Sequence, residues 1–278
     1  MREYVVRKYV WTCSLIVIAI VWLVFTGYPL IFLAQGSLKE RFFESGIWEL
    51  PKHFAFSNYA KIFASGLLYR YFINSIMIVF ISVFLIVLLS SMASYIFTRI
   101  QFPGKRLLFI LFVSGLMIPI HSTLIPVYIF TNKIGIYDTI WALIGPYVAW
   151  NLPLTIFILT AFMQDLPKEL DDAAAIDGCS PIGIYWRIVL PLCKPAIVAL
   201  TMLNFIFCWN EFLYALILVS SPESRTVPLG IYTYQGQFWG NISLVMTVVM
   251  VGVLPMLVVY AFLKKQVIRG MTFTGLKG

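Results

Sequence analysis

The sequence predicts an all-α membrane protein with six transmembrane helices and a polar loop between the fourth and the fifth. Three observations predict this fold class. The chain of 278 residues is 61% hydrophobic and 12% charged, whereas a soluble domain is about 45–50% apolar and about 25% charged. Its mean hydropathy is +0.91. The apolar runs are much longer than strands, and backbone groups cannot stay unpaired in lipid, so the runs must cross as helices.

Six apolar segments are long enough to span a bilayer, which takes roughly 20 residues. They cover approximately residues 11–33, 72–97, 107–130, 139–163, 195–219 and 243–263. The first follows Arg2, Arg7 and Lys8 and is longer than the core of a cleaved signal sequence, which has about 7–15 residues, so we expect an uncleaved first span. No internal repeat is visible, and we expect one domain over residues 1–278.

Two of these spans contain residues that disturb a helix. The third carries GLMIPIHSTLIP, and the fourth carries Pro146, Asn151 and Pro153. Proline lacks a backbone donor, and irregular backbone at membrane depth is tolerated where it faces protein or a water-filled cavity. We therefore expect a kink or a break in both spans.

The basic residues predict the orientation of the chain. The short loop from Arg99 to Arg106 is dense in positive charge, whereas residues 131–138 contain Lys133 alone. The positive-inside rule then places both termini and the loop 164–194 in the cytoplasm. A pI near 9.3 does not indicate nucleic acid here, because the basic residues flank membrane segments and form no stripe with aromatic partners.

The polar interval of about residues 165–191 predicts two short helices joined by a bend. Asp165 is suited to cap the first helix, with Pro167 in its first turn. Gly178 is suited to end it, because glycine adopts left-handed backbone at little cost. Ser180 and Pro181 predict the start of the second helix. On these features alone the interval is a structured loop between two membrane helices.

The pattern of this interval resembles the EAA signature of membrane subunits in bacterial ATP-binding-cassette (ABC) importers. That signature reads E-A-A, three residues, G, nine residues and I-x-L-P. The matching positions are Asp172, Ala173, Ala174, Gly178, Ile188, Leu190 and Pro191. Asp172 departs from the signature, since it replaces glutamate and keeps the charge. The flanking ELDDAAAIDG and RIVLPLCKPAI are similar to the carbohydrate branch, the maltose/maltodextrin-type permeases.

The resemblance extends over about residues 58–278 and implies a permease subunit of an ATP-driven carbohydrate importer in the bacterial cell membrane. Such a subunit forms half of the translocation path, and its EAA loop transmits the motion of the ATPase. The implied partners are a second related permease, two cytoplasmic ABC ATPase subunits and an extracytoplasmic solute-binding protein. ATP and Mg²⁺ would then be held by the ATPase subunits, so no cofactor is expected in this chain.

The sequence carries no motif for catalysis. It lacks a GxxxxGK[ST] phosphate loop, a G-x-S-x-G and an HExxH. Its four cysteines form no CxxC pair, and His53 and His121 are far apart, which argues against a disulfide framework and a metal site. We expect a chain that binds and changes shape, with ATP hydrolysed by a separate subunit.

The fifth span holds Glu211, the only acidic residue deep in any predicted span. Such a carboxylate is expected to face the bundle interior, a partner or water. Helical spacing places Asn204 and Glu211 on one face, with Asn210 and Tyr214 on the adjacent stripe. These four residues are candidates for a sugar path. The other interpretation, which stays open, is hydrogen bonding between helices or subunits.

Glu211 also permits an alternative function, an ion-coupled secondary transporter with Glu211 as its intramembrane proton site. That alternative does not explain the patterned loop, and many secondary transporters contain internal repeats. A membrane scaffold or export component is a third class, and co-purification with a P-loop ATPase discriminates against it.

The last external loop, residues 220–242, contains TYQGQFWGN. From the resemblance, its residues Gly236, Gln237, Phe238 and Trp239 are candidates for contact with the binding protein. The alternative is an aromatic turn anchored at the membrane interface.

Overall fold

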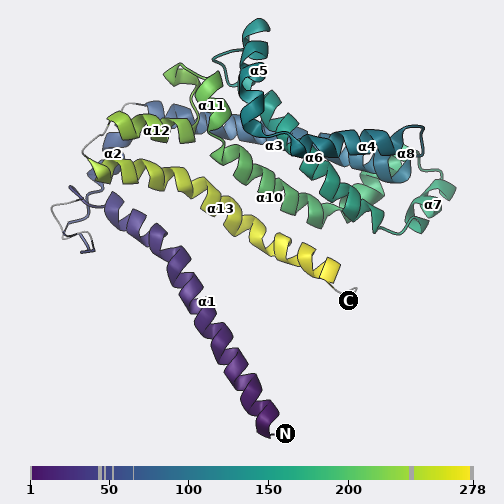
Figure 1. The fold of residues 1–278 in the computed structure, drawn as a ribbon, viewed down its shortest axis with the longest axis horizontal. Coiled ribbons are helices and arrows are strands. Elements are labelled where there is room, and N and C mark those ends of the chain that lie inside the picture. The colour runs from purple at the N-terminus through teal and green to yellow at the C-terminus, as the bar shows by residue number, and fades with distance from the viewer. Residues whose placement is uncertain are drawn as a thin grey trace. The chain divides into compact units, whose positions relative to one another are not determined.

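The structure, a computed structural model, describes residues 2–42, 46, 48–51, 53–64, 66–237 and 241–275. Within those ranges every regular element is a helix (Figure 1). The long helices are α1 (Arg2–Ser37), α3 (Leu67–Arg99), α6 (Trp141–Gln164), α10 (Lys194–Asn210) and α13 (Ile242–Gly275). The shorter helices are α2 (Ser57–Ala64), α4 (Lys105–Ser114), α5 (Ile120–Lys133), α7 (Glu169–Ile176), α8 (Pro181–Ile184), α9 (Leu190–Leu192), α11 (Leu213–Leu218) and α12 (Val227–Gln237).

Four helical segments of the described chain are long and apolar enough to cross a membrane. They are Trp11–Ser37, Leu67–Arg99, Trp141–Gln164 and Ile242–Lys264. The number rises to six if each of two bent pairs is one span. The first pair, Lys105–Met117 and Ile120–Lys133, bends by 101°, and the second, Pro181–Leu192 and Lys194–Asn210, bends by 75°. The all-α membrane fold is confirmed, and six spans are the upper value.

The break predicted in the third span lies at Ile118 and Pro119, between the 3₁₀ turn Gly115–Met117 and α5. Gly115 fits here because the chain passes close to α6. A Cβ at this position would lie 3.0 Å from Cγ of Pro153, which is tighter than ordinary van der Waals contact. A larger residue at Gly115 would therefore require Pro153 to shift slightly.

The fourth span contains no break, and a kink in it stays a prediction. Helix α6 is continuous through Pro146 and Pro153, because neighbouring groups in a membrane bundle can satisfy the backbone groups that a proline leaves unpaired. The fifth span differs from expectation. The predicted span 195–219 is instead interrupted, since α10 ends at Asn210 and the backbone is extended at Glu211 before α11 begins.

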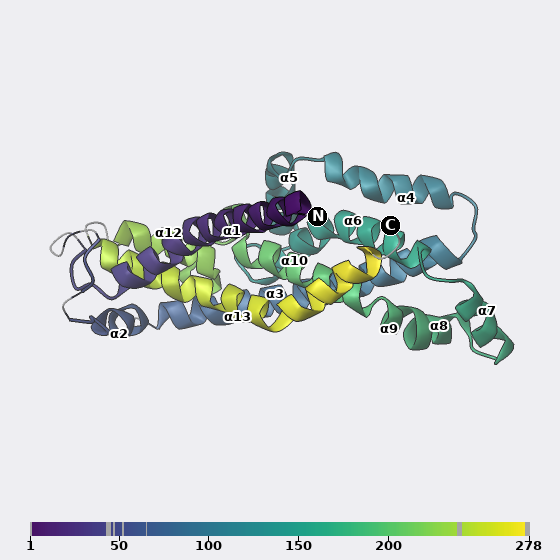
Figure 2. The same cartoon turned by 90° about the horizontal axis from the view of Figure 1, so that it is seen from below.

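The chain divides into two compact units, Met1–Ser65 with Ile231–Val253 and Gly66–Gly230 with Leu254–Gly278. That the chain acts as one domain stays a prediction. In the second unit α3, α6 and α10 run side by side (Figures 1 and 2). The face of α3 toward its neighbours is rich in small buried residues: Ser75, Ser82, Ser90, Ser91 and Ser94. Small residues let membrane helices approach closely, and the Ser94 hydroxyl donates to the Ile156 carbonyl at 3.2 Å.

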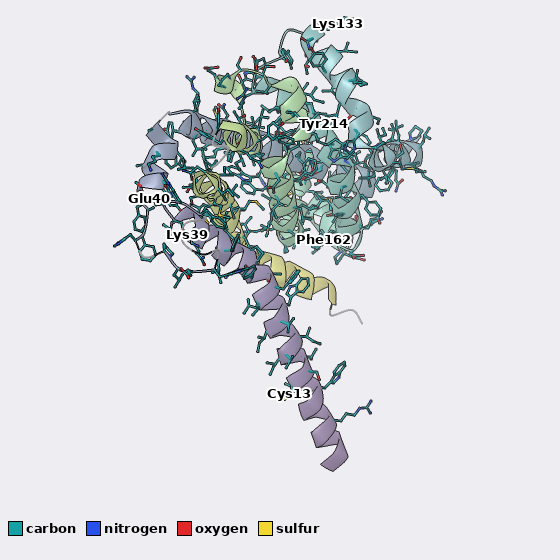
Figure 3. All side chains as sticks on the ribbon, turned by 60° about the vertical axis from the view of Figure 1, so that its left-hand side comes forward. Cys13, Lys39, Glu40, Lys133, Phe162 and Tyr214 are labelled. Carbon is teal, nitrogen blue, oxygen red and sulfur yellow. The ribbon has the colours of Figure 1, made fainter. Side chains whose placement is uncertain are left out.

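The first unit holds a buried cation, Lys39, which is 1% exposed and is labelled in Figure 3. Its ammonium donates to the Gly46 carbonyl at 2.8 Å and lies 5.3 Å from the centre of the Phe42 ring. A buried charge needs such partners. The Asn58 amide donates to the carbonyls of Ser37 and Lys39, so the turn after α1 is tied to α2.

Candidate functional site

The segment carrying the signature forms α7, α8 and α9, and α7 extends beyond the ends of α3 and α6 in both views (Figures 1 and 2). Its first helix begins later than predicted. Lys168 occupies the cap position of α7 with no side-chain hydrogen bond, whereas Asp165 ends α6, so the expected cap at Asp165 is wrong. The first turn of α7 contains the acidic residues Glu169, Asp171 and Asp172. Negative charge there is stabilising, because the N-terminal end of a helix carries a partial positive charge.

Gly178 ends α7 as predicted, in left-handed backbone with φ +83°. The Cys179 N–H donates to the Ala174 carbonyl at 2.9 Å, and the Gly178 N–H donates to the Ala175 carbonyl at 3.0 Å. This pair of bonds is the Schellman arrangement of a helix end. It turns the chain sharply toward the second helix.

The start predicted for the second helix is also confirmed. The Ser180 hydroxyl accepts the Gly183 N–H at 3.2 Å, and Pro181 is the first helical residue. A π-helical turn, Tyr185–Val189, then replaces regular α-helix. Of the signature positions in this part, Ile188 falls in the π turn, and Leu190 and Pro191 form α9.

Helices α7 and α8 pack against the transmembrane helices α3 and α6. Buried side chains of the segment share one apolar cluster with Tyr95 of α3 and with Leu159 and Met163 of α6. From the segment, the cluster takes Ala174, Ile184, Tyr185, Val189 and Cys193. Two hydrogen bonds also join the segment to α3. The Tyr185 hydroxyl lies 2.8 Å from Oγ of Ser91, and the Tyr95 hydroxyl donates to the Pro181 carbonyl at 2.9 Å. The segment is therefore in direct contact with both α3 and α6.

Arg99, the last residue of α3, connects that helix to α7. Its guanidinium donates to the Leu166 carbonyl at 3.2 Å, and its Nε lies 2.5 Å from Oδ2 of Asp171. The two side chains are 6% and 17% exposed. Burial raises the pKa of the Asp171 carboxyl, while the Arg99 guanidinium acts in the opposite direction.

Sequence reasoning missed the Arg99–Asp171 pair. From the sequence, Arg99 was considered only as part of the basic loop that sets the orientation. A usable signal was present, since Arg99 closely follows the predicted span 72–97 and is predicted to lie on the same side of the membrane as the acidic residues of the loop 164–194.

The outer face of the segment is exposed and mixes charge with apolar surface. Asp172 and Ala173 are exposed, and Ile176 and Ile182 are 86% and 72% exposed. Trp186 is half exposed. Large apolar side chains that protrude beside carboxylates are typical of a surface that meets another protein.

Two of the three buried substrate-path candidates, Asn204 and Glu211, contact side chains of α6. The Asn204 amide donates to Oγ1 of Thr155 at 3.1 Å. The Glu211 carboxylate accepts the Tyr147 hydroxyl at 2.7 Å. It also accepts the N–H groups of Tyr214 at 2.8 Å and Ala215 at 3.3 Å. Glu211 therefore caps α11 across the break that follows α10.

The other two candidates do not form a stripe beside them. Asn210 is exposed and donates to the Ile206 carbonyl at 2.8 Å and to Sδ of Met256 at 3.4 Å. Tyr214 is buried, with its hydroxyl 2.6 Å from Oγ1 of Thr123, and it lies among the side chains of the second unit (Figure 3). None of the four side chains lines either of the two pockets described below, and a role for any of them in sugar passage stays a prediction.

The candidates for contact with a binding protein lie largely outside the described part. Gly236 and Gln237 are the last two residues of α12, and Gly236 is exposed. The Gln237 side chain and all of Phe238 and Trp239 fall outside the described residues.

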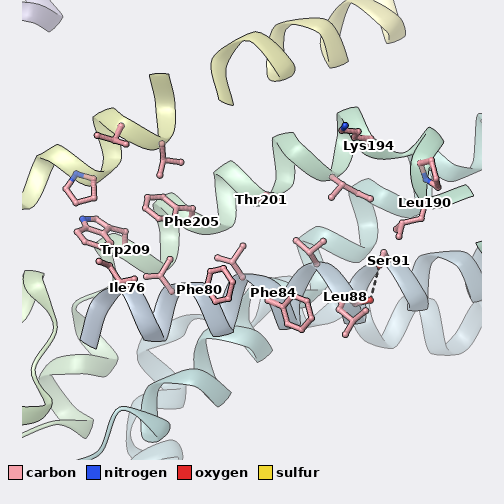
Figure 4. A pocket seen from close by; sticks show the side chains of 18 of the residues that line it. Ile76, Phe80, Phe84, Leu88, Ser91, Leu190, Lys194, Thr201, Phe205 and Trp209 are labelled. Carbon is pink, nitrogen blue, oxygen red and sulfur yellow. Dashed lines mark hydrogen bonds between the residues drawn. The ribbon is translucent and has the colours of Figure 1, made fainter. Parts of the chain in front are cut away.

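An apolar groove of about 880 Å³ runs between α3 and α10 and reaches α13. Figure 4 shows Phe80 and Phe84 of α3, with Phe205 and Trp209 of α10 on the other side. None of the substrate-path candidates lines this groove. Its apolar lining does not suit a sugar, whose hydroxyls need hydrogen-bond partners.

Comparison with known proteins identifies the family. The profile of the family described as "Binding-protein-dependent transport system inner membrane component" matches residues 68–272. The chain is 43% identical over 260 residues to a "Putative ABC transporter permease protein ORF2" of Caldicellulosiruptor sp., covering 93% of this chain and 94% of that protein. It is 36% identical over 287 residues to the "Trehalose/maltose transport system permease protein MalG" of Thermococcus litoralis, covering all of both chains.

The fold agrees with that assignment. A chain of a bacterial ABC transporter involved in the import of the acidic polysaccharide alginate superposes with a TM-score of 0.78 at 19% identity, covering 93% of this chain and 97% of that one. No comparison supports the ion-coupled alternative. The chain is a membrane-spanning ABC transporter permease and belongs to the family of binding-protein-dependent transport system inner membrane components.

Proposed function

We propose that this chain imports a carbohydrate, as one of two permease subunits of an ATP-driven transporter. The relatives support the substrate class, since they include the trehalose/maltose permease above and an "Arabinooligosaccharides transport system permease protein AraQ" of Bacillus subtilis, 30% identical over 259 residues. A sugar path through the buried polar side chains near Glu211 is part of this proposal.

The remaining partners follow from the same proposal. Two cytoplasmic ATPase subunits bind ATP and Mg²⁺, so this chain is not itself an enzyme. A solute-binding protein delivers the sugar from outside, and residues 236–239 contact it. A solved bacterial alginate ABC transporter in complex with a pentasaccharide-bound periplasmic protein, of TM-score 0.70 at 16% identity, supports this arrangement. Both termini and α7 lie in the cytoplasm, as the positive-inside rule favours.

One observation carries the proposed mechanism. Helix α7 exposes Asp172, Ala173 and Ile176 to a partner, while its other side is fixed to the transmembrane core through Ala174 and Asp171. A partner that binds the exposed side and moves therefore displaces α3 and α6. ATP binding shifts the permease between two states only if the ATPase binds them with different affinity.

Reversing the charge of the exposed acid tests this mechanism. Asp172→Lys is expected to leave membrane insertion intact and to lower sugar uptake at least tenfold in vesicles containing the whole transporter, with ATP hydrolysis no longer stimulated by sugar. Glu223→Lys is the matched control, because Glu223 is exposed near the opposite end of α3, where its carbonyl accepts the Asn74 amide. Normal uptake by Asp172→Lys would show that α7 does not couple the two reactions.

A further inference from the structure

A second pocket, of about 730 Å³, lies where α3 ends and α4 begins, against α6. It differs from the apolar groove in chemistry. Its lining combines Lys105, Arg106 and Gln101 with apolar side chains of α3 and α4, and it contains no carboxylate. Helices α3 and α4 both belong to candidate spans, so the pocket lies at a membrane surface and not inside a water-soluble domain.

The basic end of this pocket is suited to an anion. Gly104 precedes α4 in left-handed backbone and supplies no side-chain cap, and the first N–H groups of a helix lack acceptors within it. The Lys105 ammonium donates to the Ile100 carbonyl at 3.0 Å, which leaves two of its N–H groups. Arg106 is exposed and pairs with no carboxylate among the described residues. Two cations and a helix N-terminus thus point to one negatively charged group.

A buried hydroxyl in the wall of the pocket independently indicates a missing ligand. Thr160 of α6 is 2% exposed and lines the pocket, yet its Oγ1 has no hydrogen-bond partner in the described chain. Several buried threonines of the bundle bond back to their own helix, as Thr155 does to the Asn151 carbonyl at 2.8 Å. Buried polar atoms without partners are uncommon, and a hydroxyl can donate to an anionic oxygen.

The rest of the lining selects between anions. Phe97 and Phe109 meet edge to face at 5.4 Å, and with Phe102 and Ile110 they form an apolar wall. A free inorganic anion would gain nothing from that wall. An amphiphile with an anionic head would use both parts, and basic pockets between transmembrane helices are known to hold phospholipid head groups.

We propose that this pocket binds an anionic glycerophospholipid. Its phosphate meets Lys105, Arg106 and the start of α4, with the Thr160 hydroxyl as a further donor. One acyl chain follows Phe109 and Ile110 along α4. The bound lipid joins α3, α4 and α6 next to Arg99, and the site does not depend on which solute is carried.

The test measures lipid retained by the transporter, purified with its co-purifying subunits and stripped of lipid in detergent. Native mass spectrometry would compare added phosphatidylglycerol, phosphatidylcholine and inorganic phosphate. We expect phosphatidylglycerol to bind, and the Lys105→Gln/Arg106→Gln variant to weaken its binding about tenfold or more, because the variant removes both positive charges that meet the phosphate. Thr160→Val, of similar shape, is expected to weaken it severalfold.

Lys133→Gln and Lys194→Gln, changes of basic residues elsewhere in the chain, are controls expected to bind as the unaltered protein does. Equal binding of phosphatidylcholine would overturn the proposal, because the pocket would then be only apolar. Displacement of the lipid by inorganic phosphate would assign it to a free anion instead. Unchanged binding in Arg106→Gln, an exposed position that folding tolerates, or in Thr160→Val would also reject it.

Discussion

At Arg99 a single side chain joins a membrane helix to α7, the segment proposed to meet a partner. Its guanidinium contacts both the Leu166 carbonyl and the Asp171 carboxylate, so these two contacts link α7 to the end of α3. Removing one member of a buried ion pair leaves the other uncompensated and costs about 3 kcal/mol or more. We therefore propose that the pair positions α7 relative to α3.

We predict that Arg99→Gln lowers both the unfolding temperature and the number of sugar molecules imported per ATP hydrolysed. Arg99→Lys keeps the charge but loses the two-pronged donor geometry, so it should recover only part of this ratio. Transport and ATP hydrolysis are measured together in proteoliposomes. Arg70→Gln, an exposed arginine at the other end of α3, is the control. Unchanged transport per ATP in Arg99→Gln would exclude this role.

Asp138, in the loop between α5 and α6, holds that loop against the segment after α11. Its backbone is left-handed at φ +59°. Its carboxylate accepts the N–H groups of Ser220 and Ser221 at 2.8 Å each, and the Ser221 hydroxyl. Burial alone would raise the pKa of this carboxyl, but these hydrogen bonds and the charge of Arg225 hold it below its ordinary value.

This pKa shift predicts how stability depends on pH. A folded-state pKa below the unfolded value means that the ionised carboxylate stabilises the fold. That contribution is complete above the unfolded pKa of about 3.9 and is lost as pH falls through the lower folded pKa. Asp138→Asn, which tolerates left-handed backbone, should therefore lower the unfolding temperature at pH 7 and progressively less below pH 4. If the unfolding temperatures of the variant and the unaltered protein differed by the same amount at pH 7 and well below pH 4, Asp138 would not have this role.

At the scale of elements, the interruption between α10 and α11 is held together by one carboxylate. Glu211 satisfies the first N–H groups of α11 and the Tyr147 hydroxyl of α6. Buried donors without acceptors cost about 1–3 kcal/mol each. The break is thus stabilised by specific hydrogen bonds, with the Glu211 carboxylate capping α11.

We predict that Glu211→Ala destabilises the purified transporter far more than Glu211→Gln, which keeps one carbonyl acceptor. Tyr147→Phe should cost about 1 kcal/mol, since it removes one hydrogen bond. Thermal unfolding in detergent separates the three variants. A fully stable Glu211→Ala protein that fails to transport would assign Glu211 to the sugar path and remove its capping role.

The sequence predicted those features that depend on residues close together in the chain, and it missed those that depend on contacts between distant segments. Gly178, Ser180 and Pro181 act within a few residues, and their predicted roles at helix ends agree with the structure. The break at Pro119 was also predicted from local composition. The continuity of α6 through Pro146 and Pro153 was not, because it depends on the neighbouring helices that pack around it.

The candidate site divides in the same way. The spacing of Asp172, Ala173, Ala174 and Gly178 was sufficient to find the segment. The Arg99–Asp171 pair joins positions far apart in the sequence, so no local pattern indicated it. The role of Glu211 as a cap was missed because an unbroken fifth helix would have had no N-terminus there to cap.

For the whole molecule, we propose that mechanical force passes from α7 to the membrane helices. Force applied to the exposed side of α7 reaches α3 through Arg99 and the Tyr95 and Tyr185 contacts, and reaches α6 through the shared apolar cluster. The central claim is that a nucleotide-hydrolysing subunit in the cytoplasm applies that force.

Photo-crosslinking in intact cells can identify the protein that contacts α7. A photoreactive phenylalanine analogue at Ile176, which is 86% exposed, is compared with one at Met117, which is 85% exposed but lies in the bent third span. We expect Ile176 to crosslink to a polypeptide with a P-loop and Met117 not to do so. A crosslink from Ile176 only to lipid, or to a protein outside the cell, would contradict the central claim.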